Sequence, residues 1–276
     1  MGDLLRPYLA TFQARFQLML QYRAAALAGF VTQSWFGGIM IMVLAAFYGA
    51  GHGRAAPLSL GQAVSYTWMS QAFLVLIPWG GDPPVTAAVR TGAVGYDRIR
   101  PIDAYAYWFS GAAGHMLARV LPRAALIAAF AIVALPLIGL RAWAWQPPAS
   151  LLAAAAFAVA MVQVVLLASA MVVLLNLTAV LTLDNKGVVS LSTAAGVLLS
   201  GNLLPLPLFP DWMRTFLFVQ PFAGLMDIPF RIYLGELRGE GVLAGLAVQA
   251  TWILVLVTLG RVFIGGVMRR LQVQGG

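Results

Sequence analysis

Long apolar runs, separated by short polar or proline-containing stretches, dominate this chain. A helix that crosses a bilayer needs about 20 mostly apolar residues. Six runs come close to that length or exceed it, and they predict six membrane-spanning helices: Ala24–Tyr48, Gln62–Trp79, Val120–Leu140, Ala149–Leu181, Val188–Leu204 and Val242–Val267. The pattern therefore predicts an all-α polytopic membrane protein, with residues 1–276 as a single transmembrane domain.

Two segments depart from the pattern of plain spans. Within residues 1–23, apolar positions recur at helical spacing with three arginines among them, which predicts an amphipathic helix in the membrane interface. The alternative is that this segment begins a long first span. Residues 205–236 are apolar, but their prolines remove backbone donors too often for one straight helix. Because irregular backbone is tolerated at membrane depth when protein or a cavity covers it, we expect a re-entrant outer segment before the last span.

The composition agrees with a membrane protein. Hydrophobic residues make up 61% of the chain, charged residues make up 9%, and the mean hydropathy is +0.87, far from the values of soluble domains. The net charge of +8 could indicate a nucleic-acid partner, but the arginines lie between apolar runs rather than on one basic face. We therefore expect the lipid bilayer as a partner and no nucleic acid. Since the chain has no cysteine, disulfides and thiolate chemistry are excluded.

The basic residues of the short loops predict the orientation, since they collect on the cytoplasmic side. With both termini inside, nine fall on that side: Arg6, Arg15, Arg23, Arg90, Arg98, Arg100, Lys186, Arg269 and Arg270. Five fall outside: Arg54, Arg141, Arg214, Arg231 and Arg238. We therefore predict a multi-pass protein of a bacterial plasma (inner) membrane with cytoplasmic termini, in which residues 83–104 form a cytoplasmic loop.

The sequence lacks the usual motifs of nucleotide binding and catalysis. It has no glycine-rich phosphate loop followed by Lys-Ser or Lys-Thr, and its two histidines, His52 and His115, are isolated. Carboxylates near the predicted spans lie at or beyond the span ends: Asp82, Asp97, Asp103 and Asp184. Ion-coupled carriers usually keep such a group in mid-membrane. We expect no catalytic, cofactor or metal site in this chain, so the energy for any pumping comes from elsewhere.

Several polar side chains inside apolar stretches could line a translocation path. They are Gln33, Gln71, Gln163, Asn176 and Asn202. For any single residue, an interhelical hydrogen bond worth about 0.6–2 kcal/mol is the simpler interpretation. Asn202 is favoured as a path residue because it lies beside the proline break. Asp227 and Arg231 are expected to form an ion pair at the outer surface, where such a pair has little effect on stability.

Two motifs resemble those of a known family. The loop from Gly92 through Asp97-Arg98-Ile99-Arg100-Pro101 is one. The other is the outer run that begins Pro-Leu-Pro-Leu-Phe-Pro-Asp-Trp at position 205. Together with the six predicted spans, they resemble the permease subunit of type-2 ABC exporters, the ABC-2 family, over essentially the whole chain. Arg98-Ile99 departs from the pattern, because these positions are often Leu-Leu in the family.

The resemblance implies partner proteins for this chain and the residues that would contact them. The N-terminal interfacial helix and the first cytoplasmic loop would contact a separate ABC ATPase subunit, which binds ATP and Mg. Two permease chains, either copies or related proteins, would pair with two ATPases. The loop residues implied in this coupling are Arg90, Gly92, Asp97, Arg98, Arg100 and Pro101. Short helices of the outer segment would cap the exit path, with Phe209, Trp212 and Phe222 as path or gate residues.

The expected function is export of a small amphiphile, drug-like molecule, peptide or lipid. Two other classes stay open at this point. One is a membrane enzyme or assembly factor that acts on lipid-linked substrates through outer carboxylates: Asp211, Asp227, Glu236 and Glu240. Nothing in the sequence fixes two of these at catalytic separation. The other is an ATP-independent carrier, which the lack of intramembrane acids disfavours when the carrier is ion-coupled.

Overall fold

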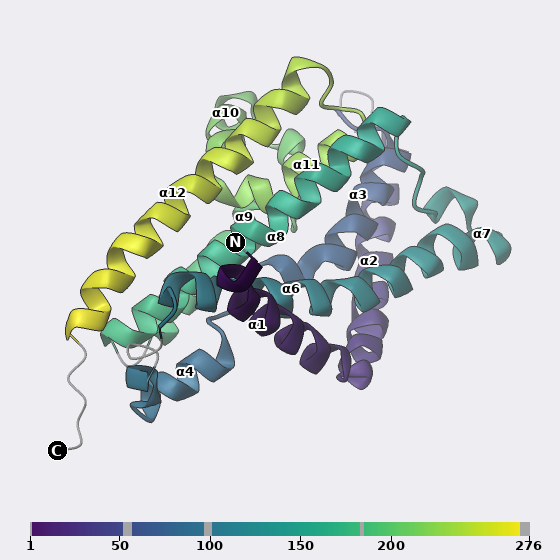
Figure 1. Ribbon diagram of the computed structural model, residues 1–276. Helices are drawn as coiled ribbons and strands as arrows, with labels where there is room; N and C mark the ends of the chain where they lie inside the picture. The colour runs from purple at the N-terminus through teal and green to yellow at the C-terminus, as the bar shows by residue number, and fades with distance from the viewer. Residues whose placement is uncertain (1, 52–56, 97–100, 183–184, 271–276) are drawn as a thin grey trace.

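A computed structural model describes residues 2–51, 57–96, 101–182 and 185–270, and the regular elements within these ranges are all helical (Figure 1). Within these described residues, four helices are long and apolar enough to cross a membrane. They are α2 (Arg23–Gly49), the continuous helix that runs from α6 through α7 (Ala104–Leu137), α8 (Leu151–Thr182) and α12 (Glu240–Arg270). The chain is therefore a multi-pass membrane protein.

The other two predicted spans are shorter helices. Helix α3 (Leu60–Phe73) and helix α9 (Lys186–Leu199) have 14 residues each, which gives a length of about 21 Å at 1.5 Å per residue. The hydrocarbon core of a bilayer is about 30 Å thick. The first is followed by a 3₁₀ turn, η2 (Leu74–Leu76), and the second ends before Gly201, whose φ is +86°. Their helical character is confirmed, and six complete crossings stay a prediction.

Helix α6 starts well before the predicted third span. The sequence predicts Val120 as the start, but the helix begins at Ala104, where the Asp103 carboxylate accepts a hydrogen bond from the Ala106 N–H at 2.7 Å. Such an N-cap satisfies a backbone donor of the first turn. The helix widens into a π-helical segment, η4 (Phe130–Ala134), before α7 (Leu135–Leu137). Pro136 accounts for the widening, since a proline ring clashes with the preceding turn of a regular α-helix.

Helix α1 (Gly2–Leu20) packs along α6. The two backbones approach closely at Gly114, where a Cβ atom would lie 2.4 Å from the carbonyl oxygen of Phe12. Leu5, Leu9 and Leu18 are exposed on α1, as an amphipathic helix at a membrane surface requires. The location of this helix in the interface stays a prediction.

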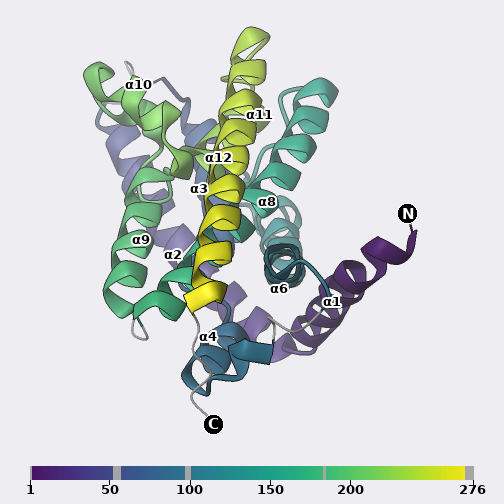
Figure 2. The same ribbon diagram turned by 60° about the vertical axis from the view of Figure 1, so that its left-hand side comes forward.

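The outer segment is a chain of short helical pieces, as its prolines predict. It comprises η6 (Leu206–Leu208), α10 (Asp211–Val219), η7 (Pro221–Leu225) and α11 (Asp227–Tyr233). Its prolines stand directly before these pieces or in their first turns, where a missing N–H breaks no helical hydrogen bond. Figure 2 shows α10 and α11 at one end of the molecule, with α4 (Pro83–Arg90) at the other. Re-entry into the membrane stays a prediction.

Candidate functional site

The α4 segment, residues 83–96, lies at the end of the molecule where α8 and α12 finish (Figure 2). Val85 and Val89, four residues apart on α4, point to one face of the helix and are buried. They share a cluster with Val94 of the 3₁₀ turn η3 (Ala93–Gly95) and with residues of three long helices. Those residues are Tyr105 and Trp108 of α6, Val173 and Leu177 of α8, and Ile264 of α12. The segment thus shares one hydrophobic cluster with the ends of all three helices, and α4 itself packs on α8.

Gly92 ends α4 in a conformation that favours glycine. Its φ is +75°, and its N–H donates to the carbonyl of Val89 at 3.2 Å, while the N–H of Thr91 donates to Ala87 at 3.0 Å. A left-handed residue that closes the last helical turn is a common helix end. A Cβ at Gly92 would meet no atom within 4 Å, so glycine is favoured here by the backbone conformation and not by a lack of room for a side chain. Ala87, Thr91, Gly92 and Tyr96 are exposed, so this side of the segment is open for contact.

The rest of the predicted coupling loop is partly described. Pro101 is exposed. Asp97, Arg98, Arg100 and the side chain of Arg90 lie outside the described residues. The loop ends at Asp103, whose N–H donates to the hydroxyl of Tyr8 on α1 at 3.0 Å. Its carboxylate lies 3.9 Å from the guanidinium of Arg261 on α12. The end of the loop is therefore fixed to both helices.

A partly buried linker, residues 77–82, joins η2 to α4. The side-chain oxygen of Asn176, on α8, accepts a hydrogen bond from the Asp82 N–H at 2.7 Å. Gly81 permits this contact, because a Cβ there would lie 2.4 Å from the same oxygen. The Asp82 carboxylate is 3.3 Å from the guanidinium of Arg15 on α1. Burial raises the pKa of Asp82, and Arg15 partly opposes that shift. Asn176 thus holds the linker in place, and its role on a path stays a prediction.

The other predicted path residues are spread over the molecule. Gln71 is buried on α3 against Gly37 of α2, where a Cβ would lie 3.2 Å from Gln71 Cγ. Gln33, on α2, is half-buried. Gln163, on α8, is also half-buried, and its side-chain oxygen is buried with no hydrogen-bond partner among the described residues. The structure does not bring these side chains together in one described cavity.

A buried polar cluster lies within the outer segment, at its contact with α3. The carboxylate of Asp227, with no exposed surface, accepts hydrogen bonds from the Tyr66 hydroxyl at 3.0 Å and the Leu206 N–H at 3.2 Å. It also pairs with Arg231 at 3.2 Å. Arg231 in turn donates two hydrogen bonds to Glu236. The expected pair of Asp227 and Arg231 is confirmed, but its expected surface location is wrong, because the broken backbone folds over the Asp227 carboxylate.

Asn202 lies next to this polar cluster. Its N–H donates to the Ser200 hydroxyl at 3.3 Å, and its side-chain nitrogen is buried without a hydrogen-bond partner among the described residues. The carbonyl of Ser200 accepts the N–H of Asp227 at 3.0 Å. Between them, Gly201 allows the closest approach, because a Cβ there would lie 2.2 Å from the Tyr66 hydroxyl. Asn202 is thus joined to the outer segment through one short turn.

The three predicted gate aromatics occupy different surroundings. Phe209 is half-buried and packs in the outer cluster with Leu206 and Leu217. Phe222 is half-buried against the main hydrophobic core. Trp212, by contrast, is 80% exposed. The structure therefore does not gather them at one point, and their role as a gate stays a prediction.

Gln249 is a buried polar residue that the sequence analysis missed. Gln249, on α12, has no exposed surface, and its side-chain N–H₂ donates to the carbonyls of Gly224 at 2.7 Å and Ala160 at 3.3 Å. It thereby joins α12 to η7 and α8. The signal was present as a lone glutamine within the apolar run Val242–Val267.

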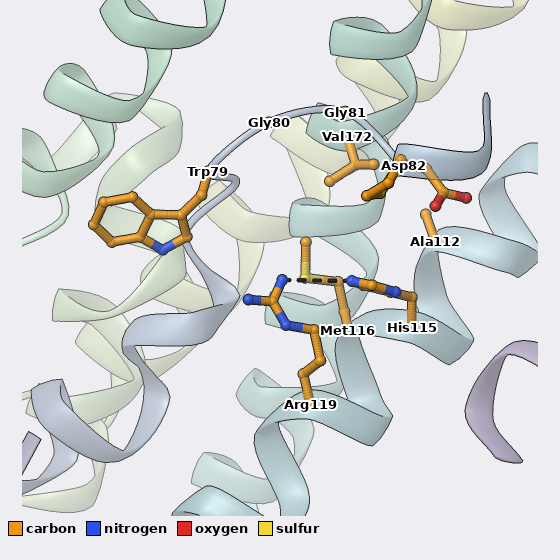
Figure 3. A pocket seen from close by; sticks show the side chains of 10 residues that line it. Trp79, Gly80, Gly81, Asp82, Ala112, His115, Met116, Arg119 and Val172 are labelled. Atoms are coloured by element: carbon orange, nitrogen blue, oxygen red, sulfur yellow. Dashed lines mark hydrogen bonds between the residues drawn. The ribbon is translucent and has the colours of Figure 1, made fainter. Parts of the chain in front are cut away.

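A small cavity adjoins the linker before α4. Its volume is about 170 Å³, and Trp79, Asp82, His115 and Arg119 contribute its polar or aromatic lining. Figure 3 shows His115 and Arg119 projecting from the same helix beneath Gly80 and Gly81, with Trp79 and Asp82 at opposite ends of the linker. The Arg119 Nη1 atom lies 3.4 Å from His115 Nε2. The cavity therefore presents a guanidinium group beside apolar walls.

Comparison with known proteins identifies the family. A family model described as ABC-2 family transporter protein matches residues 80–275. The match begins in the linker before α4 and includes the α4 segment, α6, α8, α9, the outer segment and α12. No curated protein matches the chain. Since the family match covers most of the sequence, the resemblance is confirmed. The chain belongs to the ABC-2 family of transporter proteins.

Proposed function

We propose that this chain is the permease subunit of an ATP-driven exporter in a bacterial inner membrane, with both termini in the cytoplasm. Family membership supports a membrane component of a transporter. One observation carries the proposal beyond that: α4 packs on α8, and Val85 and Val89 share one hydrophobic cluster with α6, α8 and α12, while the opposite side of α4 stays exposed. This arrangement is expected of a helix that contacts a partner protein with its exposed face and transmits the resulting displacement through its buried face.

In this proposal, a separate ABC ATPase subunit binds ATP with Mg and contacts the exposed side of the α4 segment. Close-packed side chains transmit displacement, because protein interiors have few voids to absorb it. A movement of α4 would therefore shift the ends of three long helices together. Such coupling runs through rigid, packed elements between the cytoplasmic site and the membrane path.

A second permease chain, either a copy or a relative, would complete the path between two facing subunits. The transported molecule would be a small amphiphile, a drug-like molecule, a peptide or a lipid. It would leave beneath the outer segment, where Asn202 and the Asp227 cluster lie. Chemistry on the substrate is not required of this chain, since transport changes only its location.

Site-directed photo-crosslinking tests this proposal. Because the chain contains no cysteine, single substitutions Ala87→Cys and Thr91→Cys each introduce one attachment point for a photoactivatable maleimide on the exposed side of α4. Asp211→Cys, on the exposed helix α10 at the other end, is the matched control. We expect crosslinks to a co-expressed ABC ATPase from the first two variants only.

Equal crosslinking from all three positions, or from Asp211→Cys alone, would contradict docking at α4. ATP hydrolysis by the purified chain in the absence of any ATPase subunit would contradict the division of labour between two proteins. Both measurements use the full chain in membranes or detergent.

A further inference from the structure

The Arg119 side chain has no carboxylate partner in the part of the chain that the structure describes. Its nearest polar contact there is His115 Nε2 at 3.4 Å, which cannot neutralise it. The one carboxylate of the same cavity, Asp82, is paired with Arg15 at 3.3 Å and is 4% exposed. An ionised group within a membrane protein is costly unless it is paired or hydrated. Arg119 is therefore left without a counter-ion among the described residues.

The cavity around Arg119 suits a compact anionic group. Apolar walls come from Ala112, Met116 and Val172, and a volume of about 170 Å³ remains open between them. A guanidinium presents several N–H donors in a planar fork that matches two oxygens of a phosphate. A phosphate or phosphodiester would therefore satisfy both the charge and the donors of Arg119.

Trp79, which lines the cavity, indicates that the cavity opens near the membrane surface. Its ring is 47% exposed, and its indole N–H is held by the carbonyl of Leu74 at 3.3 Å. Tryptophan is enriched at the level of lipid head groups. The amphipathic helix α1 reaches the same place through Arg15. Basic pockets between membrane helices on the cytoplasmic side are a known setting for phospholipid head groups.

We propose that this cavity binds the phosphate of an inner-leaflet phospholipid, with Arg119 as the principal ligand and Trp79 at its entrance. Phosphate recognition does not depend on the proposed transport function, whereas the inner-leaflet location rests on the proposed orientation. The bound head group would lie against Gly80 and Gly81, in the linker that leads directly into α4, while the Asp82 carboxylate stays paired with Arg15. A lipid would thus become part of the support of the α4 segment.

Native mass spectrometry of the full delipidated chain in detergent tests the proposal. The probes are dioleoylphosphatidylglycerol, dioleoylglycerol, which has the same tails without phosphate, and inorganic phosphate as a competitor. We expect phosphatidylglycerol to bind, and Arg119→Gln to weaken that binding about tenfold or more, since a charge-assisted hydrogen bond is lost. Ala112→Leu, which fills the cavity without removing charge, should weaken it as well.

Arg123→Gln is the matched control. Arg123 lies on the same helix but packs against Gly29 of α2 and does not line the cavity. Binding equal in wild type, Arg119→Gln and Ala112→Leu, or equal loss with Arg123→Gln, would overturn the proposal, provided that circular dichroism shows each variant folded. Equal binding of dioleoylglycerol would overturn phosphate recognition. Displacement of the lipid by millimolar inorganic phosphate would assign the site to a soluble anion and overturn the lipid as its occupant.

Discussion

The hydroxyl of Tyr66, on α3, donates a hydrogen bond of 3.0 Å to the fully buried carboxylate of Asp227, on α11. These residues are 161 positions apart in the sequence. Their contact joins the short, buried helix α3 to the outer segment. Gly201, in the turn after α9, approaches the same Tyr66 hydroxyl.

Tyr66→Phe should lower the stability of the protein by about 1–3 kcal/mol, because a buried carboxylate loses a hydrogen-bond donor. Thermal unfolding in detergent measures this as a lower melting temperature. Tyr96→Phe is the control, since Tyr96 is 68% exposed and its change should leave the melting temperature where it was. Identical curves for the two variants would contradict a structural role for the Tyr66 contact.

Arg231→Met should destabilise the fold by about 3–5 kcal/mol, because it leaves the buried charge of Asp227 without its partner. Adding Asp227→Asn to this variant should recover much of the loss, since the uncompensated charge is then removed. The matched surface pair is Arg214 and Asp211, 2.6 Å apart on α10. Arg214→Met should have no measurable effect. Additive losses in the double variant would contradict the coupling.

If the proposed function is right, Gly92→Ala should reduce ATP hydrolysis by the complex of this chain with its ATPase, because alanine is strained at a φ of +75°, at a cost of about 1 kcal/mol. Gly92→Asn should be tolerated better, as asparagine enters this conformation more easily. Gly187→Ala is the control: no atom lies within 4 Å of its added Cβ, and its φ is not in the left-handed range. Equal activity of the alanine and asparagine variants would exclude a conformational role of Gly92.

Gln249→Leu should destabilise the packing of α12 on α8 by about 0.6–2 kcal/mol, the range of interhelical hydrogen bonds in membranes. The carbonyls of Gly224 and Ala160 would lose their donor in a buried place. Chemical denaturation in mixed micelles can measure the change. Thr251→Leu, two residues along the same helix at an exposed position, should leave stability unchanged.

The long apolar helices could be predicted from the sequence because their hydrophobic runs end sharply. Helix α2 begins at Arg23, and the predicted span begins at Ala24. Helix α8 covers Leu151–Thr182, and the predicted span covers Ala149–Leu181. The start of α6 could not be placed, since Arg119, Pro122 and Arg123 interrupt the apolar pattern of a helix that continues through them.

The candidate site was harder to predict than the helices. The amphipathic pattern of α4 could be predicted from local sequence, but the residues that surround its valines depend on tertiary packing. Burial of Asp227 was not foreseeable, because it requires Tyr66 and the Leu206 N–H to arrive from distant parts of the chain. Polarity alone also could not distinguish Asn176, which secures a linker, from a path residue.

Helix α8 is unbroken from Leu151 to Thr182 and makes contacts near both of its ends. Toward one end it carries Asn176, Val173 and Leu177, which hold the linker and α4. Toward the other, its Ala160 carbonyl receives Gln249. Because α8 is continuous, a tilt of one of its ends would move the other end without local unfolding of the helix. In the proposed exporter, the length and continuity of this one helix would then set how far a displacement of α4 moves the opposite end.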